Sequence, residues 1–92
     1  MNNVFYRGTI IRFEYCFDVP QKDIYIIAEH QDDNFPFQLI CISGQKSGTI
    51  GAFIKKDVII NQKAVSKQHL LDEIHRNFLN FDDDSFEVMF QS

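Results

Sequence analysis

The apolar residues of this chain change their spacing once, and that change constrains the fold more than any other feature. From Thr9 to Asp18 they alternate with polar residues, which is the period of a strand with one buried face. After Ser66 they recur instead at the period of a helix. Four residues form the apolar stripe of this helix: Leu70, Leu71, Ile74 and Phe78. A chain that begins as strands and adds one helix late is predicted to have an α+β fold.

Turn-forming residues divide the rest of the chain into short apolar segments. Strands are predicted at Thr9–Asp18, Ile24–His30, Phe35–Ser43, Thr49–Ile54 and Ser85–Phe90, with a short additional one at Val58–Ile60. Turns are predicted at Val19–Asp23, Gln31–Asn34, Gly44–Gly48 and Asp82–Asp84. The order β-β-β-β-(β)-α-β predicts a curved antiparallel sheet of five to six strands, with one helix in the C-terminal half packed on it.

Three of these elements carry more specific expectations. Phe35–Ser43 is apolar at both alternating positions, so we expect a central strand that is covered on both faces. Ser66 is a good N-cap for a helix that ends near Leu79. The residues of this helix predicted to face water are Lys67, Asp72, Glu73 and Arg76. In the last strand, Phe86, Val88 and Phe90 are expected on one face.

With 92 residues, the chain is predicted to form a single domain over 1–92. Thirteen acidic against nine basic residues give a net charge of −4, which disfavours nucleic acid and anionic membranes as direct partners and favours a basic protein. The N-terminus lacks the apolar segment of a signal peptide, and no apolar run approaches a membrane span. Two cysteines make no disulfide framework, so we expect a cytoplasmic protein with reduced thiols.

Three catalytic or cofactor interpretations are weak. Gly44–Gly48 contains Lys and Ser, but they precede the second Gly and a strand follows, so a hairpin turn fits better than a phosphate loop. Cys16 lies between acidic residues and Cys41 in the most apolar strand, and both are poor settings for a nucleophile. The histidines and cysteines lack metal-site spacing. We therefore expect no enzyme, no metal and no cofactor.

Acidic residues are the one uneven feature of the sequence. They lie in two predicted turns and at the start of the last strand: Asp32, Asp33, Asp82, Asp83, Asp84 and Glu87. These turns can be simply solvated, because turns favour polar residues. Alternatively, the carboxylates form a surface that binds a basic protein and speeds its association. We take these six residues as the candidate partner-binding site.

Three segments resemble the small bacterial immunity proteins that neutralise polymorphic toxins, in particular immunity protein family forty-five. They are Arg7–Phe13, Leu39–Gly48 and the helix opening Val65–Leu71. The resemblance implies a cytosolic inhibitor without catalysis, which binds one cognate toxin and protects the cell that produces it. It does not identify the contact residues.

The residues and the resemblance together predict a non-enzymatic immunity protein that neutralises a toxin domain, with a nuclease as the expected target, by occluding a basic site. A second hypothesis is a homo-oligomeric ligand-binding or regulatory module, with Phe86–Phe90 as an edge strand that pairs with a second copy. A small hydrolase using Cys16 or Cys41 is the third.

Overall fold

The computed structural model describes residues 3–60 and 63–92, which form strands and a single α-helix. In chain order these elements are β1 (Val4–Phe5), β2 (Ile10–Cys16), β3 (Pro20–Asp32), β4 (Phe35–Cys41), a 3₁₀ turn (Gly44–Lys46), β5 (Ile50–Ile54), β6 (Val65–Ser66), α1 (Lys67–Asn77) and β7 (Asp82–Phe90).

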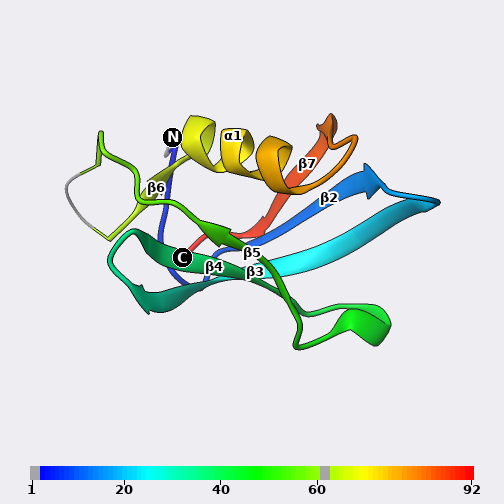
Figure 1. Cartoon of the computed structure of the whole chain (residues 1–92), viewed down its shortest axis with the longest axis horizontal. Helices are drawn as coiled ribbons and strands as arrows, with labels where there is room; N and C mark the ends of the chain where they lie inside the picture. Colours follow the sequence, from blue (N-terminus) through cyan, green and yellow to red (C-terminus); the bar gives the residue numbers. More distant parts are fainter. Residues whose placement is uncertain (1–2, 61–62) are drawn as a thin grey trace.

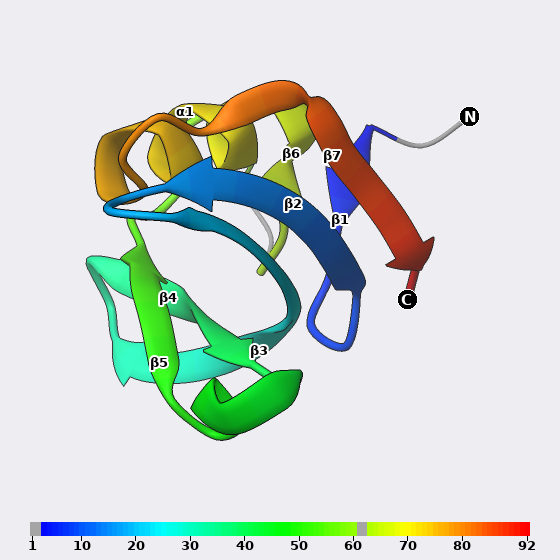
Figure 2. The same cartoon turned by 90° about the vertical axis from the view of Figure 1, so that its right-hand side faces the viewer.

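Five strands form the main sheet in the order β5-β4-β3-β2-β7, each antiparallel to its neighbours. Figure 1 shows α1 lying along one face of this sheet, and Figure 2 shows how the sheet curls around the space beneath the helix. The prediction of an α+β fold, with a curved antiparallel sheet and one helix in the C-terminal half, is confirmed.

The core lies between the inner face of the curled sheet and α1. Ile11 and Phe13 are fully buried at alternate positions of β2, as the period of two predicts. Phe13 stacks on Tyr25 of β3 with ring centroids 5.0 Å apart, and it meets the edge of Phe78 at 5.0 Å. Such pairs add about 0.5–1.5 kcal/mol beyond the buried area, so the aromatic cluster stabilises the join between sheet and helix.

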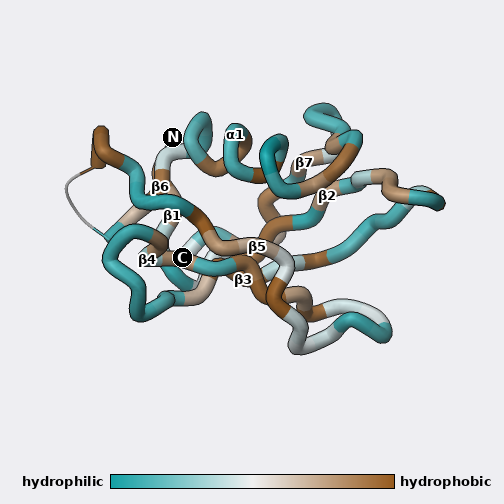
Figure 3. The backbone as a smooth tube through the Cα atoms, in the orientation of Figure 1, coloured by the Kyte–Doolittle hydropathy of each residue, from teal (hydrophilic) through white to brown (hydrophobic). Residues whose placement is uncertain are grey.

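The predicted start of the helix is confirmed, because the Ser66 hydroxyl accepts a hydrogen bond from the His69 amide at 3.2 Å. Leu70, Ile74 and Phe78 are buried, and Leu71 is half-buried against the core. Figure 3 shows the hydrophobic parts of α1 turned toward the sheet. The predicted end near Leu79 is wrong by two residues, since Phe78 is already extended and closes the helix.

The prediction that Glu73 faces water is wrong. Its side chain is 3% exposed, and its Oε1 accepts a hydrogen bond from the backbone amide of Lys55 at 2.9 Å. Arg76 lies 3.4 Å from the other carboxylate oxygen. Glu73 thus supplies an acceptor to the backbone amide of the residue that follows β5.

The predicted turn at Val19–Asp23 is also wrong, since β3 begins at Pro20 and pairs with β2 from that residue. Proline lacks an amide hydrogen, which is tolerated at the first residue of a strand. At its other end β3 extends through Asp32, so the turn before β4 is confined to Asp33 and Asn34. The chain bends instead between Phe17 and Val19, which are both exposed.

Val58–Ile60, predicted as a short strand, forms a turn, and Val58 and Ile59 are each 81% exposed. A second, two-stranded sheet that the sequence analysis missed joins β1 to β6. Its strands are two residues long, which is too short for a periodic pattern to reveal.

Asp82–Asp84 is not a turn, because β7 begins at Asp82. β7 has a neighbour on one side only, so its polar residues stay in water while Phe86 packs against the core. The prediction that Phe86, Val88 and Phe90 share one face is wrong for Phe90. Val88 lies opposite Ile11, which faces the core, whereas Phe90 lies opposite Ile10, which faces the other side of the sheet. The register shift between these two pairs adds one residue to β7 and turns Phe90 outward.

Candidate binding surfaces

The six predicted site residues fall into two groups that the fold keeps apart. Asp32 and Asp33 lie at the hairpin between β3 and β4, whereas Asp82, Asp83, Asp84 and Glu87 lie on β7. Figure 1 shows that hairpin on the left of the view and the start of β7 on the right, well separated along the longest axis. The structure therefore does not bring the six carboxylates together into one surface.

The start of β7 is the more concentrated acidic region. Asp82, Asp83 and Asp84 are all exposed, and Glu14 of β2 lies opposite Asp82 in the ladder. We call these four residues the acidic strand end. Like charges directly opposed across two strands repel each other, so this pairing destabilises the free protein unless a cation neutralises it.

Local hydrogen bonds hold the acidic strand end in place. Asp82 Oδ1 accepts from the amide of Asp84 at 3.0 Å, and Ser85 Oγ accepts from the amide of Glu14 at 2.8 Å. Asp83 Oδ1 lies 2.6 Å from His75 Nε2 of α1. The backbone is thus ordered, while the oxygens of Asp84 make no hydrogen bond within the described residues.

Glu87 differs from its three neighbours because it forms an ion pair with Arg12 of β2, which lies opposite it. Within the described residues, the buried Nε atom of Arg12 has no hydrogen-bond partner. Glu87 is therefore already paired with a cation of the neighbouring strand, and it is a weaker candidate for partner binding than Asp82–Asp84.

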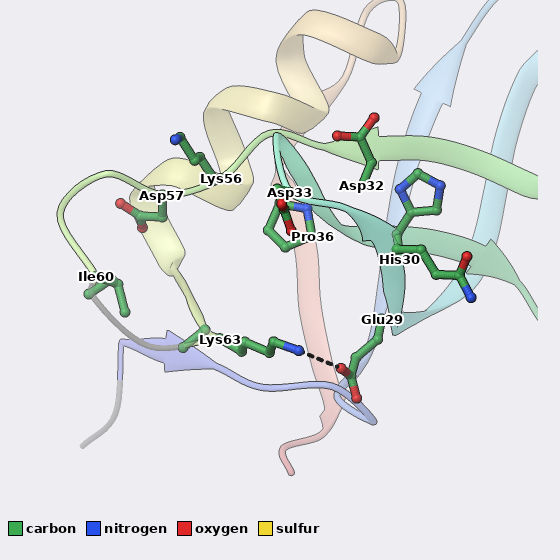
Figure 4. A pocket seen from close by; sticks show the side chains of 11 residues that line it. Glu29, His30, Asp32, Asp33, Pro36, Lys56, Asp57, Ile60 and Lys63 are labelled. Carbon is green, nitrogen blue, oxygen red and sulfur yellow. Dashed lines mark hydrogen bonds and ion pairs between the residues drawn. The ribbon is translucent and has the colours of Figure 1, made fainter.

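Asp32 and Asp33 border a groove of about 690 Å³ between the β3–β4 hairpin and the segment after β5 (Figure 4). Asp32 Oδ1 accepts from the amide of Asn34 at 2.8 Å, which stabilises the turn. The groove also holds Lys63, whose Nζ lies 3.4 Å from Oε1 of Glu29. Arg7 pairs with the same carboxylate and lowers the pKa of Glu29. The groove therefore mixes acidic and basic side chains, and Glu29 is already paired with two cations.

Asp57 fixes the segment beside this groove. Its carboxylate accepts from the amide of Ile59 at 3.0 Å and from the amide of Ser66 at 2.9 Å. Burial alone raises the pKa of Asp57, but the hydrogen bonds from Ser66 and Ile59 outweigh it and leave the pKa lowered. The turn that carries Val58 and Ile59 is thereby tied to the start of α1, with its hydrophobic tip in solvent (Figure 3).

A third surface, which the sequence analysis missed, is the outer face of the main sheet. β4 was predicted to be covered on both faces, but only its inner residues Phe37, Leu39 and Cys41 are buried. On the outer side Ile40 is half-buried and Ile42 is 40% exposed. The apolar residues at both alternating positions of β4 were the available signal, and no element of the described chain covers the outer set.

Of the remaining chemical candidates, Cys41 and Lys46 make structural contacts. Cys41 is buried, with its Sγ 3.4 Å from the carbonyl oxygen of Ser43, and Cys16 is half-buried. Lys46 donates to the hydroxyl of Tyr15 at 3.0 Å, which raises the pKa of Lys46. In residues 3–60 and 63–92, no three His, Cys, Asp or Glu side chains form a group that could hold a metal ion.

Comparisons with protein-family models, with curated proteins and with solved structures gave no match. Over the described ranges, no helix has both the length and the apolar character needed to cross a membrane.

Proposed function

We propose that this chain is a non-enzymatic immunity protein of the bacterial cytoplasm, which neutralises a cognate toxin domain by binding a basic site on it. The acidic strand end carries the proposal. It places the exposed carboxylates of Asp82, Asp83 and Asp84 beside the half-buried Glu14 of the neighbouring strand, and hydrogen bonds fix the backbone that carries them. A nuclease is the expected target, because its substrate-binding site is basic.

The electrostatics favour a cationic partner at this position. Glu14 and Asp82 face each other, and the nearest cation to Glu14 is Lys22, at 3.8 Å and half-exposed. Lys22 already offsets part of this repulsion, and a lysine or arginine of a partner would offset more of it, in addition to the usual exposed ion pair of about 0.2–1 kcal/mol. The acidic strand end would also steer a basic protein during diffusion.

The resemblance to immunity proteins supports the biological role. Its three segments cover the first half of β2 with the preceding turn, the end of β4 with the 3₁₀ turn, and β6 with the start of α1. None of them includes the residues of β7. The contact residues are therefore proposed from the charge distribution, and the role from the resemblance.

Co-expression tests the role. A toxin domain encoded beside the gene for this protein is expressed in a bacterial host with and without this chain, and both growth and co-purification are scored. We expect this chain to restore growth and to co-purify with the toxin domain at a fixed ratio. A host that stays poisoned although both proteins are folded and abundant would contradict the proposal.

The second hypothesis, a homo-oligomeric ligand-binding or regulatory module, is favoured by one observation, the open apolar outer face of the sheet. A module of this kind would self-associate without any toxin, and co-expression would leave the growth of a poisoned host unchanged.

A further inference from the structure

We propose that the outer face of β3, β4 and β5 is a self-association surface, on which a second copy of this chain packs to form a homodimer. Six apolar side chains define this outer patch: Ile24, Ile26, Ile40, Ile42, Ile50 and Phe53. The inference is independent of toxin binding, since the acidic strand end lies on other strands.

The register of the sheet makes the outer patch continuous. Ile26 lies opposite Ile40, and Ile40 lies opposite Ile50, so three strands contribute one unbroken apolar row. A register shift after Leu39 brings Ile50 to this face. In the next row, the amide of Ile42 donates to the carbonyl of Ile24 at 2.8 Å.

The exposure of the patch is unusual for a sheet with one solvated face. Ile42 is 40% exposed, Ile50 52% and Phe53 42%. Outer faces of antiparallel sheets are normally polar, and contiguous exposed apolar surface marks an interaction site. The ring of Phe53 packs against the ring of His30, with centroids 4.6 Å apart.

The charge distribution around the outer patch favours a second copy of this chain as its partner. The outward positions from Ile24 to Ala28, from Gln38 to Ile42 and at Ile50 and Phe53 carry no ionisable group, and His30, which packs against Phe53, lies at their border. The charges at the rim pair with each other, Arg12 with Glu87 and Lys22 with Glu14. The six side chains of the outer patch are themselves neutral, so they offer no ion pair to a charged partner. A second copy, by contrast, presents the same neutral apolar surface, and the net charge of −4 is carried elsewhere.

The two edges of the sheet support this choice over pairing through β7. β7 contains four carboxylates and two register shifts, which are the features that protect an edge strand from pairing with another chain. β5, the other edge, reads Ile-Gly-Ala-Phe-Ile with no charge and no proline, and two of its side chains belong to the outer patch. The apolar face therefore continues to an unprotected edge.

Sedimentation velocity of the full chain tests the dimer. Over roughly 1 to 200 µM, we expect the wild-type protein to shift by mass action toward twice its 10.8 kDa mass. The Ile42→Glu/Ile50→Glu variant should raise the dimer dissociation constant at least about 100-fold, because two carboxylates would have to leave water. Both positions are exposed in the monomer, and circular dichroism verifies that the variant is folded.

Val58→Glu/Ile59→Glu is the matched control, since it places the same charges at two more exposed apolar positions outside the patch. It should dimerise like the wild type. If the doubly charged patch variant fails to fold, Ile50→Gln, at the most exposed position of the patch, replaces it.

Several results would overturn the inference. One is a wild-type protein that stays monomeric throughout the concentration range. Another is a folded patch variant that dimerises normally, or a control variant that dissociates equally. If the free chain is monomeric and the patch variant instead loses binding to the toxin domain, the occupant is the toxin and not a second copy.

Discussion

The buried carboxylate of Asp57 ties the turn after β5 to the residue that caps α1, and its removal should destabilise the protein. Asp57 is 7% exposed and accepts hydrogen bonds from the amides of Ile59 and Ser66. A hydrogen bond to a charged group contributes about 1.5–3 kcal/mol, and Asp57→Ala removes two of them. Water can reach the Ile59 amide after the change, so we take the lower end and expect a loss of about 3 kcal/mol.

Chemical and thermal unfolding measure this loss. For a domain of this size, 1 kcal/mol corresponds to about 4–8 °C in Tm, so Asp57→Ala should lower Tm by roughly 12–24 °C. Asp57→Asn keeps one acceptor oxygen, so its Tm should lie between those of the wild type and Asp57→Ala. Asp33→Ala, an exposed aspartate on the same groove, is the control and should change Tm little. A folded Asp57→Ala variant within 1 kcal/mol of the wild type would refute the reasoning.

The lowered pKa of Asp57 gives the same experiment a pH dependence. Because the folded pKa lies below the ordinary value of 3.8, the stabilisation is fully present above that value and is lost as the pH falls through the folded pKa. The difference in unfolding free energy between wild type and Asp57→Asn should therefore be constant near neutral pH and shrink in acid. A difference that grows in acid would contradict the assignment.

Three further changes test the core and the thiols. Ile74→Asp places a charge at a fully buried position beneath the helix and should cost about 3–5 kcal/mol in unfolding experiments, whereas an unchanged Tm would refute the packing of α1. Glu73→Ala should cost about 1–3 kcal/mol, because a backbone amide of the loop after β5 loses its acceptor, while the exposed Asp72→Ala should be nearly neutral. Replacing both Cys16 and Cys41 by Ser should leave partner binding intact, and loss of binding by a folded double variant would restore a role for the thiols.

The sequence predicted the elements whose patterns are local. The alternation of Ile11 and Phe13 in β2 and the capping hydroxyl of Ser66 both depend on near neighbours, and both are confirmed. The α+β architecture follows from the same change in period. These features are readable because strand and helix impose fixed spacings on buried residues.

Features that depend on distant partners were not readable. Glu73 is buried because the end of β5 needs an acceptor, and no spacing within the helix signals this. Asp82–Asp84 could form part of a strand only because β7 pairs with β2 on one side and is open to water on the other. Likewise, the sequence identified the six candidate acids but not their arrangement. Only the structure separates Asp32 and Asp33 from the acids of β7 and places Glu14 beside Asp82.

Binding kinetics of the acidic strand end test the central claim most directly. Asp82→Asn, Asp83→Asn and Asp84→Asn are combined in one variant, and Asp32→Asn with Asp33→Asn forms the matched control. Each is measured against the toxin domain encoded beside the gene, at low and at moderate salt. We predict that the triple variant associates about tenfold more slowly at low salt, that salt narrows the difference, and that the control binds like wild type. Equal association rates for the triple variant and the wild type at both salt concentrations would contradict the account.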